Sequence, residues 1–208
     1  MWRRLVFLCC AVGVGSAAIG ATTASFRATT ETPVSTFSAA PFFCTSEAQT
    51  VTASADSWVD EAAGLVNQGI ATNIQVQSRS SNRNRRALVS FALPAIPQHC
   101  TLQSARLRVF ATSSSPNRTL QALRLASSWS ELLVNWTLQP ATTGAASIAT
   151  SAVGWVEWNV LTQVQALYSG TNNGFLIRDA AEGANPSQTQ VFSSREGLNP
   201  PQLVLTFA

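Results

Sequence analysis

The sequence predicts an all-β protein, an antiparallel β-sandwich or jelly roll of about nine strands with one short helix near residues 160–169. Three observations predict this class. Apolar and polar residues alternate in short runs, which is the period of half-buried strands. Turn residues separate these runs at regular intervals along the chain. A helical period occurs in one short segment only.

The predicted strands begin near residue 49 and continue to the C-terminus. The clearest alternation, with apolar residues on one face, is found in five segments: 73–78, 87–93, 104–112, 155–160 and 202–208. Less regular patterns lie at 49–54, 119–126, 174–179 and 189–194. In the segment WVEWNV, Trp158 has the parity of the inward residues and is expected in the core, whereas Trp155 falls on the opposite face.

The helix is predicted from the segment NVLTQVQALYSG. Leu161, Val164 and Leu167 recur at three-residue steps and therefore share one face. Asn159 is placed to cap the start of this helix, and Gly170 is placed to end it.

Residues 1–24 have the layout of a secretory signal peptide. Two arginines precede an apolar run, and small residues follow it. The run has about 17 residues, the short limit for a membrane span, so an uncleaved anchor is a second interpretation. Residues 25–48 are expected to form an extended Thr/Ser-rich arm, and residues 49–208 to form the β-sandwich. The protein is therefore predicted to be secreted or associated with the cell surface.

Two cysteines, Cys44 and Cys100, remain after removal of the signal peptide. An even number of cysteines in an exported protein predicts a disulfide bond between them, with two buried free thiols as the alternative. All 13 basic residues are arginine, and the formal net charge is only +3. This low charge excludes the strongly basic surface typical of proteins that bind nucleic acid.

Six segments in order resemble the DNRLRE domain, which is also classed as carbohydrate-binding module family 96 and as disaggregatase-related. They are ADSWVDEAAGLVNQG, RRALVSFALPAIP, SARLRVFAT, SSWSELLVNWTLQP, GWVEWNVLTQVQALYSGTNNGFLIRD and VFSSREGLNPPQLVLTF. The resemblance extends over residues 50–207 and implies a β-sandwich of jelly-roll type on a secreted or surface protein. Some members of that family are attached to polysaccharide-degrading enzymes and bind acidic glycans such as alginate. This sequence departs from that pattern because it contains no catalytic partner domain.

No catalytic residue is predicted. The single histidine, His99, lies beside Cys100, and no acid that would complete a catalytic triad can be identified. A glycosidase pair of carboxylates stays open, with these candidates: Glu131, Glu157, Asp179, Glu182 and Glu196. No cysteines and histidines have the spacing of zinc ligands. No cofactor is predicted, although a structural calcium ion bound by Asp56, Asp60 and Glu196 is an alternative.

The arginines of the segment QSRSSNRNRR are the first candidates for ligand binding. Arg79, Arg83 and Arg85 lie close together, and a guanidinium group matches the carboxylate of a uronic acid in a bidentate manner. The alternative is a solvated hairpin tip. Trp58 and Trp129 are the next candidates, as stacking platforms for a sugar. Such large rings are more often buried in the core, so Trp129 and Trp136 are expected to be mainly structural.

The sequence therefore predicts a secreted, non-catalytic, carbohydrate-binding-like module. Its expected partner is an extracellular polysaccharide, with uronic-acid-containing chains as the favoured class. Neither nucleic acid nor, after signal cleavage, a membrane is an expected partner. A structural cell-envelope or adhesion module without a glycan ligand is the main alternative, and an unrecognised hydrolase is a third interpretation.

Overall fold

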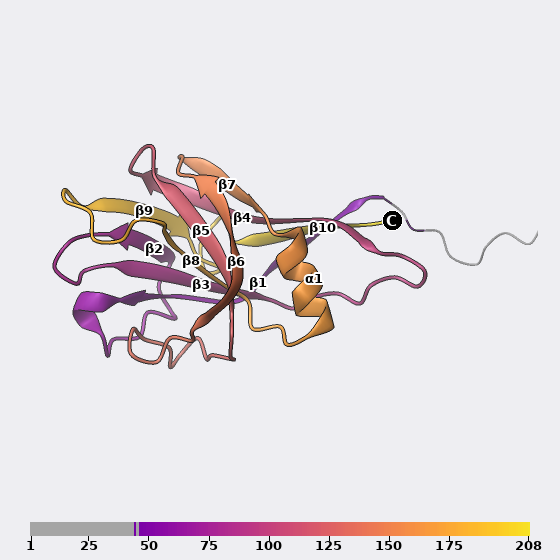
Figure 1. The fold of residues 1–208 in the computed structure, drawn as a ribbon, viewed down its shortest axis with the longest axis horizontal. Helices are drawn as coiled ribbons and strands as arrows, with labels where there is room; N and C mark the ends of the chain where they lie inside the picture. The colour runs from indigo at the N-terminus through magenta and orange to yellow at the C-terminus, as the bar shows by residue number, and fades with distance from the viewer. Residues whose placement is uncertain (1–43, 45) are drawn as a thin grey trace, which may run out of the picture. The chain divides into compact units, whose positions relative to one another are not determined.

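A computed structural model describes residues 44 and 46–208 (Figure 1). The predicted signal peptide, residues 1–24, and most of the predicted arm, residues 25–48, lie outside the described residues. Within the described part, no helix combines the length and the apolar character that crossing a membrane requires.

Nearly all the regular secondary structure of the described chain is β-strand. In order they are β1 (Ala48–Asp60), β2 (Asn73–Ser78), β3 (Arg85–Phe91), β4 (Leu102–Ser114), β5 (Thr119–Leu125), β6 (Thr142–Thr150), β7 (Gly154–Asn159), β8 (Phe175–Asp179), β9 (Gln188–Ser193) and β10 (Gln202–Phe207). A 3-10 helix, η1 (Glu61–Ala63), follows β1, and the helix α1 (Leu161–Ser169) follows β7. The all-β class and the helix near residues 160–169 are confirmed.

Six of the strands close into a barrel, in the order β1, β10, β4, β9, β2 and β3, with β3 returning to β1. The length of β1 makes this closure possible, because residues 48–52 pair with β10 and residues 53–60 pair with β3. Strands β8, β5 and β6 extend the sheet from β3, and β7 pairs with β4. The result is sandwich-like. The predicted jelly-roll order is not established by this topology, and the described residues contain ten strands rather than nine.

The additional strand is β6, with the sequence TTGAASIAT. It pairs with β5 alone among the described strands and lies at the end of the strand order. Its residues are exposed or half-exposed, and none is buried. Pairing of its backbone with β5, rather than burial of a side-chain face, therefore defines this strand, and no alternating pattern marks it in the sequence.

The main core lies between the layers, with Trp158 of β7 fully buried in it. The indole Nε1 of Trp158 donates a hydrogen bond to the Leu120 carbonyl oxygen at 3.1 Å, which joins β7 to β5 across the core. Val164 and Leu167 of α1 pack against the same core. The N-cap residue of α1 is Val160, which makes no side-chain capping bond, so the predicted cap at Asn159 is one residue too early. Asn159 Oδ1 nevertheless accepts a hydrogen bond from the Leu161 amide at 3.2 Å.

The predicted disulfide bond joins Cys44 to Cys100, with their Cα atoms 5.6 Å apart. It ties the segment before β1 to the residues that enter β4. Tyr168 of α1 lies nearby, and its hydroxyl donates to the Pro94 carbonyl oxygen at 2.9 Å.

A second, smaller core covers the outer face of the layer formed by β1, β3, β8 and β5. Its buried residues are Val59, Leu88, Leu123, Leu125, Val134 and Leu176. Loop 126–141 packs over this face and places Trp129 and Trp136 at its border. The Trp129 indole donates to the Asn173 carbonyl oxygen at 3.0 Å. Both half-buried tryptophans therefore attach the loop to the sheet, as expected from their sequence.

Candidate functional site

The structure separates Arg85 and Trp58 from the other predicted ligand-binding residues. Trp58 is only 8% exposed and belongs to the main core, so it offers no ring face to a sugar. The Arg85 guanidinium lies 4.9 Å from the Trp58 ring centroid. Its Nε donates to Asp60 Oδ2 at 2.9 Å, and its Nη1 donates to Gln75 Oε1 at 2.6 Å. Arg85 therefore joins β1, β2 and β3, and its role is structural.

Arg79 and Arg83 lie at the exposed tip of the β2–β3 hairpin. Within residues 44 and 46–208, neither guanidinium has a hydrogen bond or an ion pair. Asn84 holds the tip against the β8–β9 loop, because its Oδ1 accepts from the amides of Arg79 and Gly183 at 3.1 and 3.0 Å. The two positive charges are therefore exposed on a backbone that is itself fixed.

Three polar side chains, those of Arg86, Arg178 and Gln121, lie in one row across the outer face of the same layer, beyond the edge of loop 126–141. Val59 of β1 pairs with Arg86 of β3, and Arg178 of β8 pairs with Gln121 of β5. Strands β3 and β8 are themselves paired next to Arg86 and Arg178, at Ala87 and Ile177. The row continues from Gln121 to Ile148 on β6. Val59 belongs to the outer core, so antiparallel pairing places the whole row on the outer side of the sheet.

Arg86 is fixed in this row by three neighbours. It forms two hydrogen bonds with the Glu182 carboxylate, both of 2.7 Å, and lies 4.5 Å from the Trp136 ring centroid. Its Nη1 also donates to Gln139 Oε1 at 3.2 Å. Arg86 and its three neighbours are half-buried, and so are Gln121 and Arg178. Arg86, Gln121, Trp136, Gln139, Arg178 and Glu182 form what we name the arginine face, which the hairpin tip adjoins through the β8–β9 loop.

Arg178 differs from Arg86 in having no acidic partner. Its Nε donates to Gln121 Oε1 at 3.0 Å, and no carboxylate of the described residues lies within ion-pair distance. Sequence reasoning missed Arg178 because it is far from Arg86 along the chain. Its one signal in the sequence is that it falls on the same outward face of its strand as Leu176. That signal places Arg178 near Arg86 only when β8 is known to pair with β3.

A polar network joins strand β1 to loops 126–141 and 194–201. The Arg195 amide donates to Asp56 Oδ2 at 2.6 Å, and the Asp56 amide donates to Glu131 Oε1 at 2.8 Å. The Arg195 guanidinium binds both Glu131 oxygens, at 2.8 and 2.9 Å. The pKa of Asp56 is raised to about 7, mainly by burial. The hydrogen bond from the Arg195 amide and the Arg195 charge lower it, and the charges of Glu196 and Glu131 raise it.

This raised pKa predicts a stability that depends on pH. The folded protein keeps the Asp56 proton up to about pH 7, whereas an unperturbed carboxyl loses it near 3.8. The folded state therefore binds more protons between these values, and the Asp56 contribution to stability falls as pH rises through that window. At 1.36 kcal/mol per pKa unit the fall is at most about 4 kcal/mol.

Asp56→Asn should remove this fall because asparagine has no proton to release while its side-chain oxygen can still accept from the Arg195 amide. Thermal unfolding of both proteins between pH 4 and 8 tests this expectation. The melting temperatures should diverge in favour of the variant as pH rises, and parallel curves would show that Asp56 does not titrate as described.

The three acids considered for calcium do not meet in one place. Asp56 and Glu196 lie close to Arg195, whereas Asp60 pairs with Arg85. In the part of the chain that the structure describes, no three His, Cys, Asp or Glu side chains are grouped in a way that could hold a metal ion.

All five carboxylates considered as glycosidase pairs form ion pairs with arginine. The pairs are Glu131–Arg195, Glu157–Arg108, Asp179–Arg118, Glu182–Arg86 and Glu196–Arg195. A retaining or inverting glycosidase needs one protonated and one ionised carboxyl group facing each other across a sugar. In these pairs each carboxylate faces a guanidinium group, not a second carboxyl group across an open cleft.

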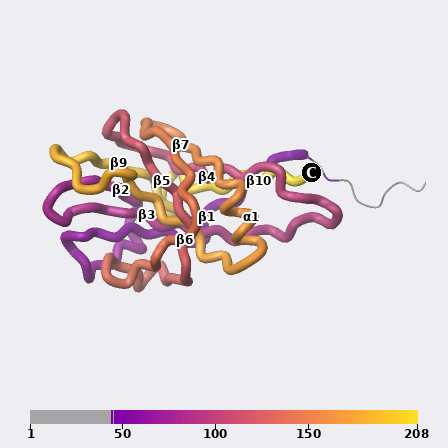
Figure 2. Tube along the Cα trace, viewed as in Figure 1, coloured from indigo at the N-terminus to yellow at the C-terminus, as the bar shows by residue number. Residues whose placement is uncertain are grey.

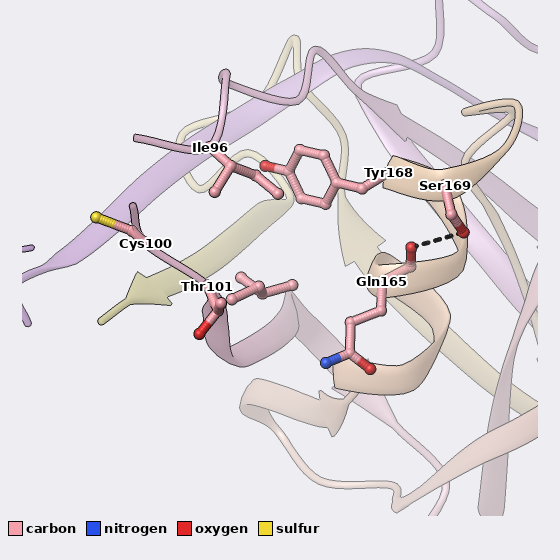
Figure 3. Close-up of a pocket in the computed structure, with 7 residues that line it drawn as sticks. Ile96, Cys100, Thr101, Gln165, Tyr168 and Ser169 are labelled. Carbon is pink, nitrogen blue, oxygen red and sulfur yellow. Dashed lines mark hydrogen bonds between the residues drawn. The ribbon is translucent and has the colours of Figure 1, made fainter. Parts of the chain in front are cut away.

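A cavity of about 370 Å³ lies between α1 and the segment before β4 (Figure 3). Ile96, Leu102 and Tyr168 give it a largely apolar lining, and Cys100 of the disulfide bond lies at its edge. Its lining contains no charged residue. This cavity therefore lacks the groups that would recognise an acidic ligand, and the arginine face is the better candidate.

The sequence model of carbohydrate-binding module family 96 matches residues 47–207, from the start of β1 to the end of β10. No curated protein matches the chain.

Proposed function

The chain belongs to carbohydrate-binding module family 96, and we propose that it is a secreted, non-catalytic module that binds acidic extracellular polysaccharide through its arginine face and the adjoining tip of the β2–β3 hairpin. The family supplies carbohydrate as the ligand class. The acidic character of the ligand rests on one observation: three guanidinium groups on this face and the adjoining hairpin tip, those of Arg79, Arg83 and Arg178, lack a carboxylate partner among the described residues.

These groups suit a uronic-acid chain for a chemical reason. A guanidinium group binds a carboxylate through two parallel hydrogen bonds, which gives both charge and orientation. A polyuronate presents such carboxylates at regular intervals, and its hydroxyl groups need polar partners of both kinds. Gln121, Gln139 and the Glu182 carboxylate offer these partners beside Trp136.

Two further observations support the non-catalytic and secreted parts of the proposal. The pairing of each candidate carboxylate with arginine argues against a glycosidase centre. The Cys44–Cys100 disulfide bond suits an oxidising compartment outside the cytosol.

Calorimetry on single arginine variants tests the proposed site. Arg178→Ser and Arg83→Ser should each weaken binding of polygalacturonate by about tenfold, as expected for loss of one charge-assisted contact of about 1.4 kcal/mol. Arg106→Ser is the matched control, because it removes one arginine charge from β4, where the Arg106 side chain is 62% exposed and weakly paired with Glu157 at 3.5 Å. The control should bind as the unmodified protein does.

Salt dependence gives a second readout. Binding should weaken as salt is added, because exposed charges are screened over about 10 Å at 0.1 M. Equal losses in Arg178→Ser and Arg106→Ser would show that net charge, and not this face, controls binding. If no glycan binds, a structural cell-envelope or adhesion module is the remaining interpretation.

A further inference from the structure

Three neighbouring loops carry most of the exposed large aliphatic side chains of the described residues. Leu65 and Ile70 of loop 64–72 are each 80% exposed. Leu132 and Leu133 of loop 126–141 are 62% and 67% exposed. Val66, Leu138 and, on loop 194–201, Leu198 add to them, and these seven residues form what we name the aliphatic patch.

The loops that carry the patch are held together by hydrogen bonds. Asn67 Nδ2 donates to the carbonyl oxygens of Glu131 and Val134, both at 2.7 Å. Gly69 lies so close to the Glu131 carbonyl that a Cβ atom at this position would collide with it. Loop 194–201 joins them through the ion pair of Arg195 with Glu131. Figure 2 shows loops 64–72 and 126–141 along the same lower edge of the molecule.

These contacts between the loops keep the aliphatic side chains exposed. Loops that are fixed at several points cannot fold their apolar residues back onto the core. Such an arrangement removes much of the ordering cost that a flexible loop would meet on binding. The patch is therefore preorganised as a contact surface.

The size of the patch matches one half of a stable protein interface. Burial of one Leu or Ile side chain corresponds to roughly 60–120 Å² at about 25 cal/mol per Å², so seven partly exposed ones supply roughly 300–600 Å² of apolar area. Apolar atoms make up about 65% of a homodimer interface, and a standard interface buries about 800 Å² per partner. An apolar patch of this area is comparable to the largest one on a typical monomer, about 300–600 Å², and such patches are often functional.

The charge around the patch distinguishes between partners. The three loops contain only Glu131, Arg195 and Glu196 as charged residues, and Arg195 pairs with both acids. No excess of basic residues is present in these loops to attract an anionic lipid surface. No aromatic ring belongs to the patch, as a sugar platform would require. A nearly neutral aliphatic surface is instead complementary to itself.

We propose that two copies of this chain associate through the aliphatic patch. In a twofold dimer the same patch lies on both sides of the interface, so each substitution acts twice. Sedimentation equilibrium of the full chain should give a dimer. The double variant Ile70→Ser/Leu133→Ser should weaken association by at least about a hundredfold, since four buried aliphatic side chains are lost.

Val153→Ser is the control, because Val153 is 69% exposed but lies between β6 and β7, outside the patch. It should leave the dimer unchanged, and circular dichroism should show that all variants are folded. A monomeric unmodified protein, or a dimer unaffected by the double variant, would overturn the proposal.

Cross-linking gives an independent readout. Leu133→Cys should form a disulfide-linked dimer under mild oxidation more readily than Val153→Cys. A monomer that instead sediments with neutral phospholipid vesicles, and loses this property in the double variant, would assign the patch to a lipid surface and overturn the dimer. None of these readouts involves a glycan, so they are independent of the proposed ligand binding.

Discussion

Trp158→Ala should lower the free energy of unfolding by about 3–5 kcal/mol, as truncation of a buried aromatic side chain does. Trp158 is 0% exposed, and its removal would leave a cavity between β7 and β5. The Leu120 carbonyl oxygen would also lose its hydrogen bond from the indole at 3.1 Å. For a chain of this size the melting temperature should fall by roughly 6–20 °C.

Trp155→Ala is the matched control, because it truncates the same residue type on the outer face of the same strand. The Trp155 ring is half-buried and contacts Phe110 and Arg108 at the surface. Its loss should cost distinctly less than the loss of Trp158. Equal losses in chemical unfolding experiments would contradict the assignment of the two faces of β7.

Replacing both Cys44 and Cys100 with serine should remove about 4 kcal/mol of stability. The disulfide bond closes a loop over a sequence separation of 56 residues. In the chain-entropy model a cross-link over a loop of this length reduces the entropy of the unfolded chain by the equivalent of about 4 kcal/mol. Urea unfolding of the double variant and of the unmodified protein measures the difference.

Reductant provides the control for this variant. It should destabilise the unmodified protein to about the level of the double variant and leave the double variant unaffected. If the two proteins unfolded at the same urea concentration without reductant, the cross-link would contribute nothing. Two alkylatable thiols in the unreduced protein would show that the bond is not formed.

Local patterns in the sequence were sufficient for most of the fold. The alternation in WVEWNV identified Trp158 as a core residue because burial on one face of a strand leaves a period of two. The cysteine count identified the disulfide bond because only one pairing was possible. Strand β6 was missed because no face of it is buried, and the closure of β1 onto both β10 and β3 depends on pairing that no local pattern encodes.

The candidate site was less accessible to prediction. Arginines close in sequence pointed to the β2–β3 hairpin, but Arg85 turned inward to Asp60, and only Arg79 and Arg83 stayed exposed. Arg86 forms its ion pair with Glu182, which lies 96 residues further along the chain. Arg178 joined the same face through strand pairing. Contacts between distant segments, rather than composition, therefore decide which charges remain unpaired.

A comparison of two ligands that differ only in charge tests the proposed function most directly. Polygalacturonate and its methyl ester share one sugar backbone, and only the first carries carboxylates. Calorimetry at low salt should show binding of polygalacturonate and at least about tenfold weaker binding of the ester, because the guanidinium groups of Arg79, Arg83 and Arg178 lose their ionic partners. Equal affinity for the two polymers would contradict recognition of acidic polysaccharide by the arginine face.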